Sequence, residues 1–175
     1  MAGSNHHLPD IVDYNLKILF VGFNPGLRSA ETGHHYAGPS NNFWKLLFES
    51  GLTPYRLRPE EDVRLTGMGY GSVNIVDRPT RSASEIKAAE YRRGSEKLTG
   101  ILAEYKPKIA CYLGIGVYRA LTNMKDLTPG LQEHSVVKGT LDFVCTSPSG
   151  LNRMPYGEQL KCFKELKALA DTISI

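Results

Sequence analysis

The sequence has few cysteines and lacks a long apolar run. Three cysteines, Cys111, Cys145 and Cys162, are spread over 175 residues without paired spacing. This pattern predicts buried free thiols in a reducing compartment. Three are also too few to hold a four-cysteine iron–sulfur cluster within this chain. Since no apolar run approaches the roughly 20 residues that span a bilayer, we expect no membrane partner.

The N-terminus, MAGSNHHLPD, lacks the basic start and apolar middle of a signal peptide. We therefore expect an intracellular protein, nuclear in a eukaryote or cytoplasmic in a bacterium. The length fits a single domain, expected over residues 8–175, with residues 1–7 as a flexible N-terminus. The net charge of +3 is compatible with a polyanionic partner and does not by itself require one.

Short apolar runs alternate with helical patterns along the chain. Four runs are expected to be strands, at 18–21, 70–76, 109–113 and 141–146. Helical patterns occupy 43–50, 59–62, 83–105, 117–124 and 157–170, and a capping-box pattern at 82–85 is expected to open the long third one. The alternation predicts the α/β class, as a three-layer α/β/α sandwich around a mostly parallel four-stranded sheet.

The first expected strand runs directly into a turn, Gly22-Phe23-Asn24-Pro25-Gly26. A residue that precedes proline is held out of the helical region, so Asn24 is expected to be extended. In a parallel sheet this position lies at the carboxyl edge, where α/β proteins bind ligands. An Asn-Pro-Gly triplet alone is most often an ordinary turn, and further motifs are needed to assign it a function.

Three further motifs follow in order: GHHYAGPSNNFWK at 33–45, VDRPT at 76–80 and SPSGLNR at 147–153. Together with GFNPG they resemble the mismatch-specific uracil-DNA glycosylase and thymine-DNA glycosylase family, within the uracil-DNA glycosylase superfamily. The similarity runs from about Leu8 to near the C-terminus. It implies the uracil-DNA glycosylase fold and a DNA repair enzyme, a hydrolase of base excision repair.

The implied enzyme flips uracil, and in a broader reading thymine and related lesions, out of a mispair with guanine in double-stranded DNA. It then hydrolyses the N-glycosidic bond and leaves an abasic site. The enzyme is expected to be monofunctional, because no well-placed lysine lies beside Asn24 to form a Schiff base. The resemblance implies no cofactor, and we expect a monomer.

The resemblance also assigns roles to the first two motifs. Asn24 matches the catalytic position; since an amide is not a general base at neutral pH, we expect it to orient the attacking water. Tyr36 is expected to stack on the flipped base. The remaining base-pocket residues are the backbone of Gly22 and Phe23, Ser29 beside the 5-position of the base, and His35 as a base or phosphate contact.

The 147–153 motif is expected to plug the duplex where the base has left. Leu151 is the implied wedge and Gly150 the implied reader of the orphaned guanine. Ser149, Asn152 and Arg153 are expected to contact the opposite strand or a phosphate. Ser147 replaces an asparagine of the family's bacterial branch, so that asparagine's role is not carried over. The alternative is a surface loop with a chance leucine.

Other interpretations are weaker. Asp77 could act as a secondary base, although an aspartate before Arg-Pro more often caps a turn or pairs with the arginine. His34 and His35 have no third ligand at metal spacing, so we expect no metal site. Gly114-Ile115-Gly116 lacks the third glycine of a dinucleotide fingerprint. The main alternative function is a non-catalytic DNA-binding module of the same fold; the joint presence of Asn24, Tyr36 and Leu151 argues against it.

Overall fold

The computed structural model describes residues 7–174, so residues 1–6 of the predicted flexible N-terminus lie outside the described residues. Along the chain the elements are β1 (Ile18–Gly22), α1 (Leu27–Thr32), α2 (Phe43–Glu49), the 3-10 helix η1 (Pro59–Met68), β2 (Tyr70–Asn74), the 3-10 helix η2 (Ala83–Glu85), α3 (Ala88–Tyr105), β3 (Ile109–Leu113), α4 (Ile115–Thr122), β4 (Gly130–Leu131), β5 (Leu141–Cys145) and α5 (Tyr156–Asp171).

The described strands form one sheet in the order β2-β1-β3-β5-β4. The pairs β1–β2, β1–β3 and β3–β5 are parallel, which confirms the predicted mostly parallel sheet. The predicted number of four strands was wrong, because β4 pairs antiparallel with β5 at the edge. Two residues, Gly130 and Leu131, are too few to show the alternation by which a strand is recognised in a sequence.

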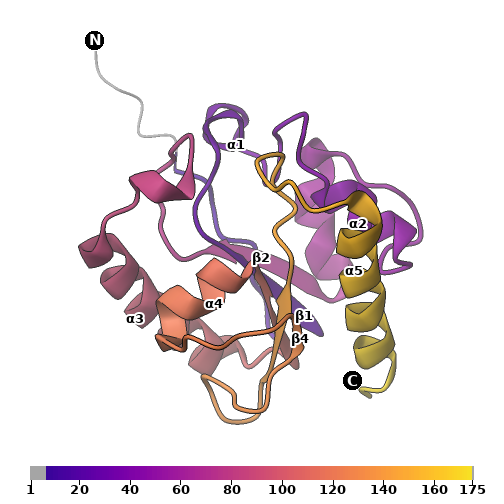
Figure 1. Ribbon diagram of the computed structural model, residues 1–175. Coiled ribbons are helices and arrows are strands. Elements are labelled where there is room, and N and C mark those ends of the chain that lie inside the picture. Colours follow the sequence, from indigo (N-terminus) through magenta and orange to yellow (C-terminus); the bar gives the residue numbers. More distant parts are fainter. Residues whose placement is uncertain (1–6, 175) are drawn as a thin grey trace.

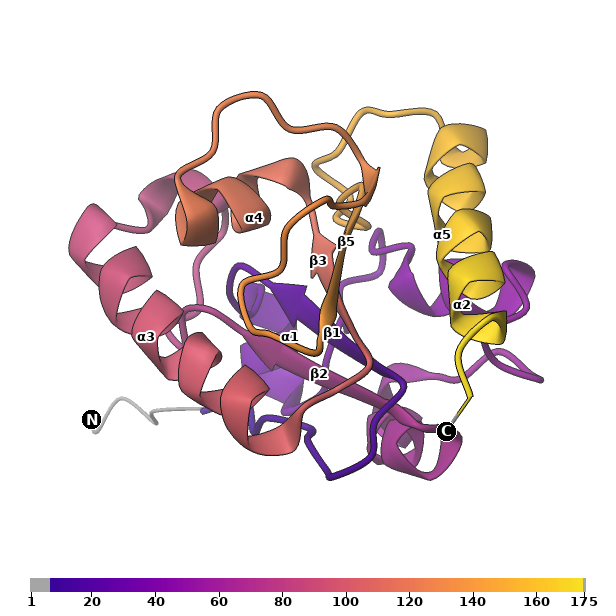
Figure 2. The same ribbon diagram turned by 90° about the horizontal axis from the view of Figure 1, so that it is seen from below.

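Helices cover both faces of the sheet, as predicted for a three-layer sandwich (Figures 1 and 2). Helices α2 and α5 lie on one face, where Phe43, Leu47 and Phe163 are fully buried. Helices α3 and α4 lie on the other face, where Leu102 and Val117 are fully buried. The β1 run is buried on both sides, which explains why it reads as continuous apolar sequence.

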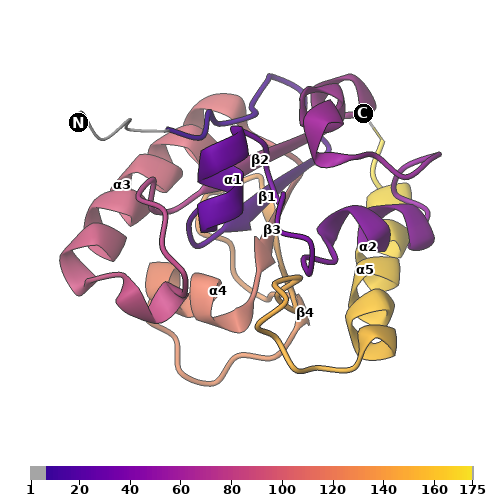
Figure 3. The same ribbon diagram turned by 90° about the horizontal axis from the view of Figure 1, so that it is seen from above.

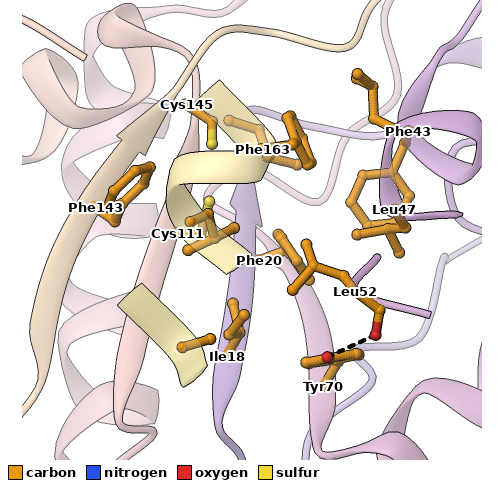
Figure 4. Close-up of a cluster of buried hydrophobic side chains, with 14 of the residues drawn as sticks. Ile18, Phe20, Phe43, Leu47, Leu52, Tyr70, Cys111, Phe143, Cys145 and Phe163 are labelled. Atoms are coloured by element: carbon orange, nitrogen blue, oxygen red, sulfur yellow. Dashed lines mark hydrogen bonds between the residues drawn. The ribbon is translucent and has the colours of Figure 1, made fainter. Parts of the chain in front are cut away.

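The core beneath α2 and α5 contains the three cysteines, of which Cys111 and Cys145 are labelled in Figure 4. All three are free and buried, which confirms the prediction. Cys111 of β3 and Cys145 of β5 lie on the same face of the sheet as Phe20, and Cys162 lies in α5. At the margin of this core the Tyr70 hydroxyl donates to the Leu52 carbonyl at 2.8 Å, which satisfies the one polar atom of that ring.

Two predicted helices differ in the structure, one in where it begins and one in its type. The capping box at 82–85 forms, but it closes only the η2 turn. The chain is extended at Ile86, with φ −82° and ψ 130°, so α3 begins at Ala88 instead. The expected helix from Pro59 is a 3-10 helix. Gly94 does not interrupt α3: a Cβ there would lie 2.1 Å from the Ile75 carbonyl oxygen, so glycine allows the helix to approach the chain that leaves β2.

Candidate active site

A cleft of about 600 Å³ opens at the carboxyl edge of the sheet, the edge seen from above in Figure 3. Four segments that are far apart in sequence meet there: the turn after β1, the loop before α2, the loop after β2 and the loop before α5. Of the predicted site residues, the cleft is lined by Gly22, Phe23, Asn24, Ser29, His35, Tyr36, Ser147, Ser149, Gly150, Leu151 and Asn152. Asp77 and Arg153 do not line it.

The amide of Asn24 is held in one orientation. Its Nδ2 donates to the Arg78 carbonyl and to Thr80 Oγ1, both at 2.8 Å. A carbonyl can only accept, so the nitrogen must face Arg78 and the two ends of the amide cannot be exchanged. Both Nδ2 protons are then used. Among residues 7–174, Asn24 Oδ1 accepts no hydrogen bond, so this oxygen is available to a ligand or a water in the cleft.

The segment that holds Asn24 is itself anchored. Thr80 Oγ1 donates to the Ser82 carbonyl at 2.7 Å, so its own proton is used and it accepts from Asn24. The Arg78 guanidinium binds both carboxylate oxygens of Glu90 on α3, at 2.7 and 3.0 Å. These bonds hold the pKa of Glu90 at about 2, well below its usual 4.5. Sequence analysis did not single out Thr80, although it is the last residue of the quoted VDRPT motif.

Two backbone N–H groups, those of Phe23 and Asn24, belong to the turn that follows β1 and lines the cleft. The β1–β3 ladder ends at Val21 and Tyr112, before Phe23. The carbonyls of Gly22 and Phe23 accept from Ile75 and Val76, while the N–H groups of Phe23 and Asn24 donate no hydrogen bond within residues 7–174. The Phe23 ring packs edge to face with Tyr91, at 5.8 Å between ring centroids. A ligand in the cleft would therefore contact the backbone N–H of Phe23.

The ring of Tyr36 lines the cleft and is tightly held. It stacks on Phe43 with 3.7 Å between ring centroids, and its hydroxyl bonds Ser72 Oγ at 2.7 Å. Burial raises the pKa of Tyr36 well above its usual value, so the phenol stays protonated. The backbone of Tyr36 has φ +52°, a left-handed conformation that costs energy for a residue with a side chain. The surrounding contacts thus hold a flat aromatic ring in the cleft wall.

His35 is almost completely buried and its ring nitrogens are occupied. Nε2 lies 2.7 Å from the Pro9 carbonyl and Nδ1 lies 3.1 Å from Ser72 Oγ. Because the carbonyl can only accept, the proton is on Nε2 and Nδ1 accepts from Ser72. Burial lowers the pKa of His35, which favours this neutral form. The ring therefore belongs to the wall of the cleft, and its nitrogens are not available for a base or a phosphate.

The 147–153 loop is held by its own hydrogen bonds. Asn152 Nδ2 donates to the Ser147 carbonyl at 2.8 Å, and Asn152 Oδ1 accepts from the Met154 N–H at 3.0 Å. The Asn152 side chain therefore shapes the loop. Ser149 Oγ accepts from the Leu151 N–H at 3.2 Å. At the tip, Leu151 is 68% exposed, the arrangement expected of a wedge.

Gly150 packs against the loop before α2. A Cβ at Gly150 would lie 2.1 Å from Ser40 Oγ and 2.5 Å from Ser40 Cβ. The Asn42 N–H also donates to the Pro148 carbonyl at 2.9 Å. Glycine is thus required for the backbone of one loop to rest on the other.

The electrostatics of the cleft are one-sided. Among the described residues that line it, none is Asp or Glu. Arg81 and Arg28 contribute positive charge, and Arg28 also pairs with Glu31 at 3.0 Å. Asp77 faces elsewhere, with Lys97 Nζ 2.7 Å from its Oδ1, and so it pairs with Lys97 and not with the neighbouring arginine. Arg153 is exposed beyond the cleft. The cleft therefore favours an anionic ligand and offers no carboxylate base.

The lining residues that the sequence analysis missed include Asn74 and Leu8. Asn74 ends β2 beside Gly22, and its Oδ1 lies 2.8 Å from where a Gly22 Cβ would be. Its position as a polar residue at the end of an apolar run was the available signal. Leu8, buried in the cleft wall, carried none. Ser29, which was predicted, is buried and accepts from the Ala37 N–H at 3.0 Å.

Within residues 7–174 no three His, Cys, Asp or Glu side chains gather as metal ligands would. No helix in this part of the chain is long and apolar enough to cross a membrane.

The fold and the cleft define an α/β protein with a candidate binding site at the carboxyl edge of a mostly parallel sheet, around one fixed amide. The model of the uracil DNA glycosylase superfamily matches residues 9–170, and the chain therefore belongs to this superfamily. The fold is also similar to an NMR structure from Methanosarcina acetivorans described as a candidate uracil DNA glycosylase. That similarity has a TM-score of 0.59 and 23% identity, and covers 92% of this chain and 97% of the other.

Proposed function

We propose that this protein is a monofunctional DNA glycosylase that removes uracil mispaired with guanine from double-stranded DNA. Membership of the superfamily supports uracil glycosylase activity on DNA. The observation that carries the proposed mechanism is the fixed amide of Asn24 in a cleft without a carboxylate. Such a site can orient a water but has no strong base to deprotonate it. This chemistry suits a substrate whose glycosidic bond is already close to breaking.

In the proposed reaction the bond between C1′ of the sugar and N1 of the pyrimidine breaks, and its electron pair leaves with the base. The sugar carbon gains oxocarbenium character, and the water oxygen bonds to it. The proton that the water loses passes, directly or through solvent, to the departing pyrimidine anion, so that neutral uracil and an abasic sugar are the products. Asn24 Oδ1 accepts a hydrogen bond from this water. The departing base carries negative charge, which the N–H groups of Phe23 and Asn24 are available to stabilise.

The base would lie against the ring of Tyr36. Stacking on one aromatic ring contributes roughly 1–3 kcal/mol per base. The Asn74 amide carries both a donor and an acceptor, which matches the N3–H and O4 edge of uracil. Arg28 and Arg81 on the rim are suited to DNA phosphates, because guanidinium groups bind phosphate oxygens in pairs.

Preference for a mispair follows from the cost of flipping. A base must leave the stack to reach this cleft, and a mispaired base leaves at lower cost than a paired one. Leu151 would enter the duplex in its place, while Gly150 would offer its backbone to the orphaned guanine. An enzyme without a carboxylate base depends most on this lower free-energy cost of flipping. We infer that G·U is a better substrate than A·U.

The test is base release from duplexes containing G·U, A·U or G·T and from single-stranded uracil DNA, with Asn24→Ala and a control. Asn123→Gly is a suitable control, because Asn123 is exposed at the end of α4 in a left-handed conformation that glycine accepts. We expect release from G·U to fall by about a hundredfold or more in Asn24→Ala and to stay unchanged in the control. Tight duplex binding by the wild type without release would favour a non-catalytic DNA-binding module.

A further inference from the structure

Residues 8–11, which we call the N-terminal strap, contribute Leu8 to the wall of the candidate active site. Leu8 is buried and lines the cleft. Ile11 forms an antiparallel bridge with Ser72 of β2, through N–H to carbonyl bonds of 2.9 and 2.8 Å. A Cβ at Gly71 would lie 2.5 Å from the Ile11 carbonyl oxygen, so glycine allows this close approach. The strap is thus attached along the outer edge strand of the sheet.

A chain of hydrogen bonds connects the strap with the cleft. The Pro9 carbonyl accepts from His35 Nε2 at 2.7 Å. His35 Nδ1 then accepts from Ser72 Oγ at 3.1 Å, and Ser72 Oγ accepts from the Tyr36 hydroxyl at 2.7 Å. One direction of donation satisfies every member: Tyr36 to Ser72, Ser72 to His35, and His35 to Pro9. The chain therefore ends at the ring proposed to stack on the base.

The position of Ser72 makes it the key member of this chain. Its side chain is fully buried, its backbone holds Ile11, and its hydroxyl lies between His35 and Tyr36. No water can replace a lost partner at such a site as it would on the surface, so removal of this hydroxyl leaves His35 and Tyr36 without a shared partner. The mechanism proposed above does not use Ser72.

We propose that Ser72 is a positioning residue and that the N-terminal strap is a working part of the base pocket, with the strap and Ser72 together setting the place of the Tyr36 ring. This inference rests on the proposed base-release activity. The position of the Tyr36 ring then depends on two sets of contacts. Stacking on Phe43 fixes the plane of the ring, and the hydrogen-bond chain fixes where the ring lies within that plane.

The experiment measures single-turnover release of uracil from a G·U duplex with enzyme in excess, which separates the rate at saturation from the affinity for DNA. Ser72→Ala is compared with Ser50→Ala. Ser50 is also buried, but its hydroxyl donates to the Leu47 carbonyl and it does not line the cleft. We expect Ser72→Ala to lower the saturated rate about tenfold with little change in half-saturation, as loss of one buried hydrogen bond would do. Ser50→Ala should retain the wild-type rate.

A double-mutant cycle with Tyr36→Phe tests the coupling. Tyr36→Phe keeps the ring and removes the hydroxyl. If the two hydroxyls act through one chain, the double variant should be little slower than the slower single variant. Effects that multiply would show independent roles and overturn the coupling. Nitrogen NMR of His35 provides a second readout: its Nδ1 resonance should move in Ser72→Ala and stay in place in Ser50→Ala.

The strap itself is tested by Leu8→Ala against Leu57→Ala. Both leucines are buried outside regular helices and strands, but only Leu8 lines the cleft. Both variants should lose stability, whereas the saturated rate should fall several-fold in Leu8→Ala alone. If Ser72→Ala and Leu8→Ala behave as their controls while the wild type releases uracil, this inference alone is overturned. A wild type that releases no base overturns the proposed function and this inference with it.

Discussion

The Asn24 side of the cleft is held by hydrogen bonds from other parts of the chain, whereas the loop that carries Leu151 is held mostly by bonds within itself. Asn24 is bound by residues 54 and 56 positions away; the first, Arg78, is anchored in turn to Glu90 of α3, and the second, Thr80, to the Ser82 carbonyl. Asn152, by contrast, bonds Ser147 and Met154 in its own segment. The first arrangement fixes one side-chain oxygen relative to the sheet, and the second shapes a protruding loop.

The difference predicts different consequences of substitution. A reaction needs its groups in one place, because even a small displacement of a water or a ring lowers the rate. A wedge needs only to be exposed, apolar and stiff enough to enter the duplex. We therefore expect changes behind Asn24 to lower the rate on every substrate. Changes in the 147–153 loop should affect only substrates that must be opened.

Among variants that keep Asn24, the largest effect is expected for Thr80→Val, which replaces the hydroxyl with a methyl of similar size. Asn24 Nδ2 loses one acceptor and the Ser82 carbonyl loses its donor, in a buried place. An unsatisfied buried group costs about 1–3 kcal/mol, so the Asn24 amide gains freedom to rotate and the rate should fall by about 10- to 100-fold. Single-turnover release from G·U and from single-stranded DNA should fall alike. Thr80→Ser, which keeps the hydroxyl, should retain most activity.

A smaller and more selective effect is expected for Leu151→Ala. The truncated side chain no longer fills the space left by the base, so the flipped state is less populated. Burying a leucine side chain contributes about 1.5–3 kcal/mol, which corresponds to a loss of about tenfold or more on a G·U duplex. Single-stranded uracil needs no wedge and should be released at the wild-type rate. An equal loss on both substrates would place Leu151 in the base pocket and contradict the wedge.

Gly150→Ala tests the contact between the two loops. The added Cβ would overlap Ser40, so the 147–153 loop must move away. We expect a loss of several-fold on duplex substrates, smaller than for Leu151→Ala because the wedge is displaced but present. Ser40→Gly removes the two nearest atoms and should restore activity to the Gly150→Ala variant. Absence of rescue would mean that Gly150 is needed for another reason, such as backbone contact with the orphaned guanine.

How much of the fold and of the candidate site could be predicted from the sequence depends on how far apart in the chain the interacting residues lie. Strands buried on both faces, such as β1 and β3, show as continuous apolar runs, and the turn at Asn24 follows from local chemistry. The resemblance then identified eleven of the residues that line the cleft. The edge strand β4 and the start of α3 were missed or misplaced, because two residues have no period and the capping box closed a shorter turn.

The supports of the site were less predictable than the site itself. Thr80, Asn74 and Leu8 line the cleft only because distant segments come together in the fold. Asp77 was expected to cap a turn or to pair with its neighbouring arginine, with a secondary base as the weaker alternative, but its partner Lys97 lies 20 positions further on, in α3. His35 looked like a ligand contact until both of its nitrogens were found to be occupied. Hydrogen-bond partners far apart in sequence leave no local pattern.

The smallest effect is expected for the anchor of the Asn24 side, the Arg78–Glu90 pair. The pKa of Glu90 falls from 4.5 to about 2 in the folded protein, so the folded state binds fewer protons than the unfolded state between these values. The stabilisation is complete above pH 4.5 and is lost as the pH falls towards 2. Thermal unfolding should therefore show a decline in stability over this range that is shallower in Glu90→Gln, which holds no charge to lose. Glu96→Gln, on an exposed position of the same helix, is the control and should keep the wild-type slope.

At neutral pH the loosened Arg78 loop of Glu90→Gln should slow uracil release by less than Thr80→Val does, because the Asn24 amide keeps both of its acceptors.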